Sequence, residues 1–316
     1  MISALFKESS ASQKIFFSGF IILLCFTIFM AIGIVFSHLL FNIDFDKLSG
    51  NLNPANPLNI PAMKFLQACF SIGLFVIPPF LIAYVIHGKI FEFLKLGSVP
   101  SFYLILLSVS LIVFSMPLVN YMALLNENIH FPAFMKEFET VFKNYESDAQ
   151  KTTNAFLHVT TFGGLLINLV VVAFIPAIGE ELLFRGVFQR LFHEWTKNIH
   201  FSIFLSSFIF SALHLQFYGT IPRLFLGMLF GYLFYWTKNL WLPMLAHFFN
   251  NAIAVILIYI NDDAVDKINT AGTENESLPL VVFSLISIVI ILYFIYRSGK
   301  EKHMVNSEIN QETYDK

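Results

Sequence analysis

The sequence predicts an all-α protein whose helices form a bundle that crosses a membrane several times. Of its 316 residues, 57% are hydrophobic and only 13% are charged, whereas soluble domains carry about a quarter charged residues. The apolar residues gather in runs of about 18 to 25, long enough to cross a hydrocarbon core about 30 Å thick. The first run, from about Ile15 to Phe41, is too long for a signal-peptide core and has no small-residue cleavage site after it. We therefore expect it to be a permanent transmembrane helix.

The apolar runs predict about eight transmembrane helices in all. In chain order, they lie near residues 15–40, 63–87, 101–125, 160–192, 199–217, 221–237, 241–261 and 278–296. This pattern divides the chain into three regions. Residues 1–158 form an N-terminal membrane region, 160–260 a central membrane domain, and 261–316 the last helix with a polar tail.

Acidic and basic residues alternate between successive loops. The 42–62, 126–158 and 262–277 loops are acid-rich. The basic residues between them are Lys7, Lys14, Lys89, Lys95, Arg185, Arg190, Lys197, Lys238, Arg297, Lys300 and Lys302. Since cytoplasmic loops carry the excess of Lys and Arg, eight helices with both termini in the cytoplasm satisfy every loop.

The 126–158 loop has a helical pattern of its own. In HFPAFMKEFETVFKNYE, aromatic and apolar residues recur at helical spacing, from Phe131 to Tyr145, while charged residues occupy the other positions. This pattern predicts an amphipathic helix at the outer membrane interface. Packing against the bundle and service as a lid over a site are both open.

Composition excludes several classes of partner. A net charge of −2 and the absence of a dense basic stretch argue against nucleic acid, which leaves the lipid bilayer as the predicted environment. The two cysteines, Cys25 and Cys69, both lie in apolar runs. A disulfide framework and a four-cysteine zinc site are therefore excluded.

One group of charges falls inside a predicted transmembrane helix. The segment IGEELLFRGVFQRLF, residues 178–192, contains Glu180, Glu181 and Arg185. A charge near the middle of such a helix costs about 2.5–3.5 kcal/mol on insertion scales. Glu181 and Arg185 are four residues apart and can pair on one face, whereas Glu180 points about 100° away and has no obvious local partner. A structural charge network and a general base at Glu180 are both open.

Two later helices carry polar groups of the same chemical kind. His214 lies in the 199–217 run, and His247 and Asn251 lie four residues apart in the 241–261 run, with Asn250 on another face. Each alone is a common satisfied polar residue of a helix bundle. A carboxylate, two imidazoles and a carboxamide together could activate water and stabilise an oxyanion. Glu180, His214 and His247 could instead hold a divalent metal, with zinc as the first choice.

The order of these residues resembles a known family. Glu180-Glu181-x-x-x-Arg185, then Phe210-x-x-x-His214, then His247-x-x-x-Asn251 is similar to the CPBP family of intramembrane proteases. That family includes CAAX prenyl endopeptidases of the Rce1 type and bacterial bacteriocin-processing relatives. The resemblance covers about residues 160–260.

The resemblance implies a role for each matching residue. Glu180 would activate the attacking water with help from His214, while His247 and Asn251 would stabilise the oxyanion. Glu181 and Arg185 would support this centre by orienting the helix. The family is described both as metalloproteases and as metal-free, glutamate-driven enzymes, so a metal is left open, although no H-E-x-x-H pair is present.

Placement within the membrane limits the substrates. Only membrane-embedded or lipid-anchored polypeptides reach such a site. A prenylated CAAX protein is one option, and a bacteriocin leader or an anti-sigma-like membrane protein is another. The expected location is a bacterial inner membrane. The rival functions are a proton- or ion-coupled carrier, in which Glu180 and the histidines relay protons, and a non-catalytic scaffold of the same fold.

Geometry makes one demand on this site. If each predicted helix is straight and centred in the membrane, His214 lies about 9 Å nearer the outer side than Glu180 and His247. An irregular helix end after Leu215, with Gly219 and Pro222 near a break, would close that gap. Arg223, just past this break, is either an extra polar group that lines the cavity or a side chain that snorkels to the membrane surface, and we expect the second.

Overall fold

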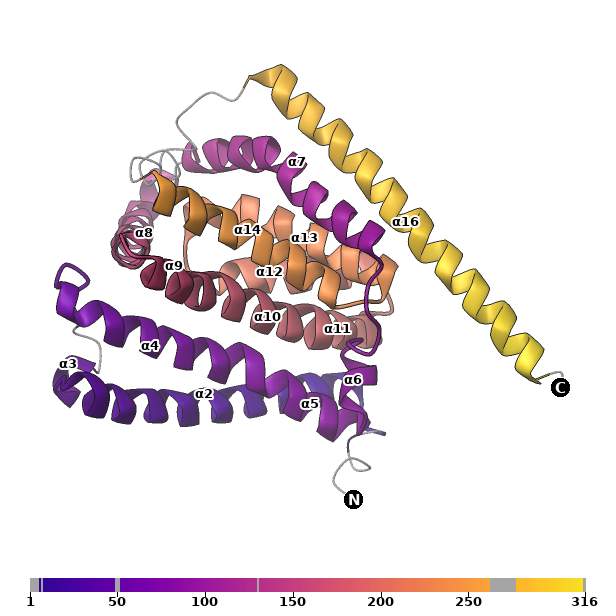
Figure 1. The fold of residues 1–316 in the computed structure, drawn as a ribbon, viewed down its shortest axis with the longest axis horizontal. Helices are drawn as coiled ribbons and strands as arrows, with labels where there is room; N and C mark the ends of the chain where they lie inside the picture. Colours follow the sequence, from indigo (N-terminus) through magenta and orange to yellow (C-terminus); the bar gives the residue numbers. More distant parts are fainter. Residues whose placement is uncertain (1–5, 7, 49–51, 130, 262–276, 315–316) are drawn as a thin grey trace.

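The computed structural model describes residues 6, 8–48, 52–129, 131–261 and 277–314, and its regular elements are all helices (Figure 1). The predicted all-α class is therefore confirmed. Within these described ranges, seven helical stretches are long and apolar enough to cross a membrane, and the chain is a multi-pass membrane protein. They are Ala11–Phe41, Pro57–His87, Phe102–Glu127, Phe162–Thr196, Phe217–Thr237, Trp241–Ile260 and Leu278–Lys300. The acidic residues predicted at 262–276 lie outside the described residues.

The fifth predicted span, residues 199–217, is shorter in the structure than a membrane requires. Helix α12 (Ile199–Ala212) has 14 residues, or about 21 Å at 1.5 Å per residue, against a core of about 30 Å. The chain turns directly after it, where Leu215 takes a left-handed φ of 54°. A short 3₁₀ turn, η6 (Phe217–Gly219), then leads into α13 (Thr220–Thr237). The expected irregular end after Leu215 is thus present.

The N-terminal region forms one side of the molecule. Helix α2 (Ala11–Phe41) begins at a capping box in which Ser10 and Gln13 bond to each other's backbone amides. It packs along a second long helix that contains a π-helical segment in its middle (Figure 1). The segments of this second helix are η1 (Pro57–Asn59), α4 (Ile60–Ser71), η2 (Ile72–Val76) and α5 (Ile77–His87). Two four-residue helices, α3 (Phe45–Leu48) and α6 (Ile90–Phe93), lie at opposite ends of this layer.

The central helix runs through the middle of the bundle. It consists of α9 (Phe162–Asn168), η4 (Leu169–Phe174), α10 (Ile175–Glu181), η5 (Leu182–Phe188) and α11 (Gln189–Thr196). The second N-terminal helix packs on it, as do α12, α13 and α14 (Trp241–Ile260). Polar side chains on this helix are therefore enclosed by protein on several sides rather than by lipid.

The last helix covers the opposite side of the molecule. Helix α16 (Leu278–Tyr314) packs against α7 (Phe102–Glu127) and α13, and its C-terminal part projects beyond the bundle (Figure 1). Buried apolar residues of α7, α13, α14 and α16 form one core cluster in this half. A second cluster lies between α2, α5, α6 and the central helix.

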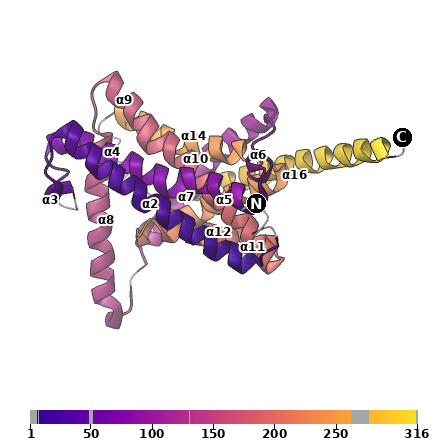
Figure 2. The same cartoon turned by 90° about the horizontal axis from the view of Figure 1, so that it is seen from below.

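The predicted amphipathic helix is present as α8 (Lys136–Leu157), preceded by the 3₁₀ turn η3 (Ala133–Met135). It runs across the bundle rather than along it: it is seen end-on in Figure 1 and lengthwise in Figure 2. Phe131 and Phe142 stack near Phe217, whereas Phe138 and Tyr145 remain exposed. An uncovered apolar face on a transverse helix is the arrangement expected at a membrane interface.

Candidate active site

Two π-helical segments flank the short α-helix α10 that carries the paired glutamates. Pro176 lies in its first turn, and proline has no amide hydrogen for the carbonyl of Val172 four residues earlier. That carbonyl instead accepts a hydrogen bond of 3.4 Å from Asn251 Nδ2 on α14. Single π-helical turns are frequent at functional sites because they redirect side chains and release backbone groups. Here the released carbonyl ties α14 to the central helix close to Glu180.

Glu181 and Arg185 form the predicted ion pair, fully buried, with 2.7 Å between Arg185 Nη1 and Glu181 Oε1. The guanidinium also donates from Nη2 to the carbonyl of Gly227 on α13, at 3.0 Å. Its planar face lies near the rings of Phe210 and Phe230. Arg185 therefore joins the central helix to α12 and α13 while it neutralises one of the two carboxylates.

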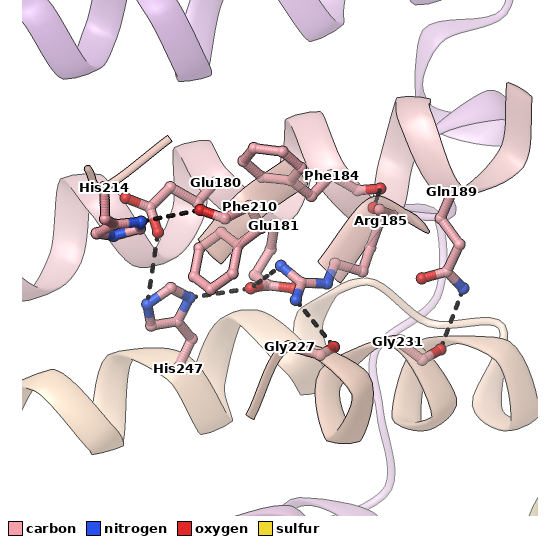
Figure 3. A network of polar contacts seen from close by, with 11 residues as sticks. Glu180, Glu181, Phe184, Arg185, Gln189, Phe210, His214, Gly227, Gly231 and His247 are labelled. Atoms are coloured by element: carbon pink, nitrogen blue, oxygen red, sulfur yellow. Dashed lines mark hydrogen bonds and ion pairs between the residues drawn. The ribbon is translucent and has the colours of Figure 1, made fainter. Parts of the chain in front are cut away.

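Helix α14 reaches the carboxylate of Glu181 through His247 (Figure 3). His247 Nδ1 donates to Glu181 Oε1 at 2.9 Å, so its other ring nitrogen, Nε2, is directed to Glu180. Nε2 lies 3.7 Å from Glu180 Oε2, which is beyond a hydrogen bond but close enough for one water to bond to both. Sequence reasoning left Glu180 without a neighbour because local spacing does not show a ring supplied by α14. In the structure, His247 connects the two adjacent glutamates.

Close approach between helices is provided by a Gly-x-x-x-Gly stripe on α13. Gly227 accepts from Arg185, and Gly231 accepts from Gln189 Nε2 at 3.1 Å, one helical turn further along both helices (Figure 3). A Cβ on Gly231 would lie 2.7 Å from Ile203 Cγ2 on α12. Small residues at this spacing let membrane helices touch at the backbone. The sequence GMLFG carried this signal, which our sequence reasoning missed.

His214 lies just beyond the last turn of α12, and Figure 3 shows its ring beside the carboxylate of Glu180. Its Nδ1 donates to the carbonyl of Phe210 at 2.9 Å. That bond fixes the tautomer and leaves Nε2 as an acceptor. The 9 Å offset expected from straight helices is closed because α12 ends at Ala212 and the chain bends there.

The two asparagines of α14 both belong to the site. Asn251 Oδ1 accepts from Asn250 Nδ2 at 3.2 Å, and both residues line the same cavity. The sequence prediction that Asn250 points elsewhere is therefore wrong. With one amide hydrogen on the Val172 carbonyl, Asn251 keeps a second hydrogen for another acceptor.

A cavity of about 770 Å³ brings the predicted residues together. Its lining residues include Glu180, His214, His247, Asn250 and Asn251. Tyr145, Asp148 and Thr152 of α8 also line it, together with Gln67 of α4. Helix α8 thus packs on the bundle and borders the cavity at once.

Arg223 lines this cavity too, contrary to the expected snorkelling. Its guanidinium bonds to both the side chain and the carbonyl of Gln216, directly after the turn at Leu215. The bonds to Gln216 hold Arg223 at the cavity. It adds a positive charge to a cavity that also holds a carboxylate.

The metal alternative makes a specific geometric demand, namely that donors of three side chains converge. Among the described residues, no three His, Cys, Asp or Glu side chains lie close enough together to hold a metal ion. His214 and His247 each use Nδ1 in a protein hydrogen bond, which leaves Nε2 of each ring as the nitrogen that could coordinate a metal. Glu180, His214 and His247 are therefore not drawn together at one point in this arrangement, and the steps proposed below use the side chains alone.

These features describe a multi-pass membrane protein with a polar, histidine- and glutamate-lined cavity enclosed by its helices. Residues 162–253 match the family model described as "Type II CAAX prenyl endopeptidase Rce1-like". The matched segment contains every predicted site residue. The central segment of this chain is therefore similar to the Rce1-like family of type II CAAX prenyl endopeptidases.

Three bacterial proteins are similar to part of the chain. Bacillus subtilis YpbD is 32% identical over 32% of this chain and 50% of that protein. Bacillus subtilis YdiL is 31% identical over 34% of this chain and 43% of that protein. The membrane-embedded CAAX protease MroQ of Staphylococcus aureus is 35% identical over 31% of this chain and 43% of that protein. The chain thus spans half or less of the length of these curated relatives, and no solved structure matches it.

Proposed function

We propose that this chain is an intramembrane endopeptidase that hydrolyses a peptide bond in a membrane-embedded or lipid-anchored polypeptide. The observation that carries the proposal is the single cavity shared by Glu180, His214, His247 and Asn251 within the Rce1-like segment. A buried carboxylate costs several kcal/mol in a membrane helix, and such residues usually face a functional cavity. The bacterial relatives support a location in a bacterial plasma membrane.

The proposed first step is activation of water. A water between Glu180 and His214 loses a proton to the Glu180 carboxylate, and its oxygen attacks the carbonyl carbon of the substrate. Glu180 is available for this role because Arg185 and His247 Nδ1 bond to Glu181 instead. His214 Nε2, left as an acceptor by the bond to Phe210, holds the same water.

The second step is stabilisation and collapse of the tetrahedral intermediate. The free amide hydrogen of Asn251 would donate to the oxyanion, as would Nε2–H of His247 when the ring is an imidazolium with its Nδ1 proton on Glu181. The C–N bond then breaks, and the proton held by Glu180 passes to the leaving nitrogen. The remaining hydroxyl proton of the intermediate also passes to that nitrogen, so the products are a new carboxylate and a new ammonium, and Glu180 returns to its ionised form.

Glu181 and Arg185 act in this proposal as positioning residues. Glu181 holds the ring of His247 through Nδ1, in the way that a carboxylate orients a catalytic histidine in other hydrolases. Arg185 holds that carboxylate in turn and neutralises its charge. A prenylated CAAX protein and a leader peptide are both substrates of the proposed class, and residues of α8 would contact them at the mouth of the cavity.

The test compares new N-termini in membranes of cells that carry wild type, Glu180→Gln or Glu92→Gln at equal levels. Glu92 is an exposed glutamate paired with Lys89 outside the cavity, so its variant controls for loss of a carboxylate. We expect a set of N-termini in wild type and Glu92→Gln that is absent in Glu180→Gln. The same N-termini in all three strains would refute the proposal and favour a carrier or a scaffold.

A further inference from the structure

A second pocket lies at the end of the bundle opposite α8. Its volume is about 510 Å³, and it lies between α6, α11 and the last turn of α13. Figure 1 shows α6 and α11 together at this end, and α8 at the other. The two pockets have no lining residue in common. This pocket is therefore separate from the proposed active site.

Three positive side chains from three segments line this pocket: Lys95 follows α6, Arg190 belongs to α11 and Lys238 follows α13. Burial lowers the pKa of the Lys238 ammonium, and the charges of Arg190 and Lys95 lower it further, so the three cations are close enough to repel one another. The acidic side chain that also lines the pocket, Glu194, is paired with Lys14 at 2.7 Å.

Arg190 has unused hydrogen-bonding capacity. Its guanidinium lies over the ring of Phe93, 4.2 Å from the ring centre. Its Nη1 is buried and has no hydrogen-bond partner among the described residues. A buried donor without an acceptor is costly, and an anion in the pocket would satisfy it.

The two loops that carry the lysines are held in place by several hydrogen bonds. Lys95 and Lys238 both take left-handed φ values, 56° and 50°, which non-glycine residues seldom adopt. The amide of Leu240 donates to the carbonyl of Lys95 at 3.2 Å. Asn239 Nδ2 donates to the carbonyl of Ser98 at 2.7 Å, and Trp241 Nε1 to that of Leu96 at 3.1 Å. The lysines are therefore brought to one pocket before any ligand binds.

We infer that this pocket binds the phosphate of an anionic phospholipid headgroup. A guanidinium and two ammonium groups match the oxygens and the charge of a phosphodiester. Leu191, Ile199 and Phe234 provide apolar wall beside these charges, which suits an amphiphile better than a free anion. Basic pockets between membrane helices at one surface are a common form of headgroup site. The ligand would fix the end of the helix that carries Glu180.

The test uses the purified full chain in a neutral detergent, and thermal unfolding is followed as lipid is added. The probes are phosphatidylglycerol, phosphatidylcholine with the same acyl chains, and inorganic phosphate. The test variant is Lys95→Gln/Lys238→Gln. The control is Lys89→Gln/Lys197→Gln, which removes the same charge from the same end of the bundle. Lys197 also has a left-handed φ of 56°, so it controls for the backbone at a helix end.

Phosphatidylglycerol is expected to raise the melting temperature of wild type and control in a saturable way, while phosphatidylcholine has little effect. The test variant is expected to bind phosphatidylglycerol about 30-fold more weakly, from the usual contribution of two basic residues near a lipid surface. Equal binding by the test and control variants would overturn the inference. Equal stabilisation by inorganic phosphate would overturn the lipid as ligand and assign the pocket to a free anion.

Discussion

The buried pair of Glu181 and Arg185 makes a sharp prediction about stability. The substitution Arg185→Met keeps an apolar chain of similar length and removes the guanidinium. Glu181 would then keep only His247 as a partner, since the 2.7 Å contact from Arg185 Nη1 is lost. The carbonyl of Gly227 would lose its donor as well. A fully buried carboxylate would be left without its cation.

The size of the effect follows from the distance and the burial. Two unit charges 2.7 Å apart attract by about 6 kcal/mol at an effective dielectric constant of about 20. Removing one partner of such a buried pair usually costs about 3–5 kcal/mol, because the other charge stays desolvated. The rings of Phe210 and Phe230 would also lose their contact with the guanidinium. We expect Arg185→Met to lose about 3–5 kcal/mol of unfolding free energy.

A double-mutant cycle separates the pair from its surroundings. The free energy of unfolding is measured in mixed micelles for wild type, Arg185→Met, Glu181→Gln and the double variant. The double variant leaves no unpaired charge, so it should lose less than the sum of the two single losses, by at least about 2 kcal/mol. Its peptidase activity should stay below wild type because His247 has lost its carboxylate. Additive losses within about 0.5 kcal/mol would refute a coupled pair.

Three further predictions concern packing, pH and metal. Gly231→Ala should lose about 1–3 kcal/mol of unfolding free energy, because the new Cβ would lie 2.7 Å from Ile203 Cγ2. The control Gly19→Ala should lose none, because no atom lies within 4 Å of its new Cβ. Equal losses for the two variants in an unfolding titration would contradict this reasoning. Burial raises the pKa of the Glu146 carboxyl, which accepts from the Tyr218 amide, so docking of α8 favours the protonated form. Docking of α8 should then be strongest at acidic pH and weaken as the pH rises above the ordinary pKa of a glutamate, and Glu146→Gln should remove this dependence. Hydrogen exchange of residues 136–157, corrected for intrinsic rates, measures the docking. Tighter docking at higher pH would contradict this prediction. Peptidase activity should survive dialysis against a zinc chelator, since no three donor side chains converge among the described residues; loss of activity that zinc restores would contradict it.

The sequence predicted most of the bundle because a hydrocarbon core sets both the length and the composition of its helices. It placed the pair of Glu181 and Arg185 correctly, since i, i+4 spacing alone decides which residues share a helix face. Of the roughly eight spans predicted, seven have the length of a membrane span among the described residues; the 199–217 span is shorter because its apolar composition continues past Ala212, where the helix itself ends. A left-handed residue such as Leu215 has no reliable sequence signal.

The spacing of residues in the sequence could not predict the contacts between helices. His247 lies beside both Glu180 and Glu181 because α14 packs at one particular rotation against α10, and that rotation depends on the whole bundle. The positions of Asn250 and Arg223 at the cavity depend on packing in the same way. The cavity contribution of α8 comes from a helix more than twenty residues away from any motif in the chain.

The measurement that tests the central claim most directly uses the purified chain in lipid vesicles. The substrate in these vesicles is a membrane protein whose new N-terminus in cells depends on Glu180. The cleavage rates of wild type, Glu180→Gln and Glu92→Gln are compared at equal amounts of folded protein. If Glu180 activates the attacking water, Glu180→Gln should cleave at least about 100-fold more slowly, while Glu92→Gln matches wild type. Cleavage by Glu180→Gln at the wild-type rate would contradict the account.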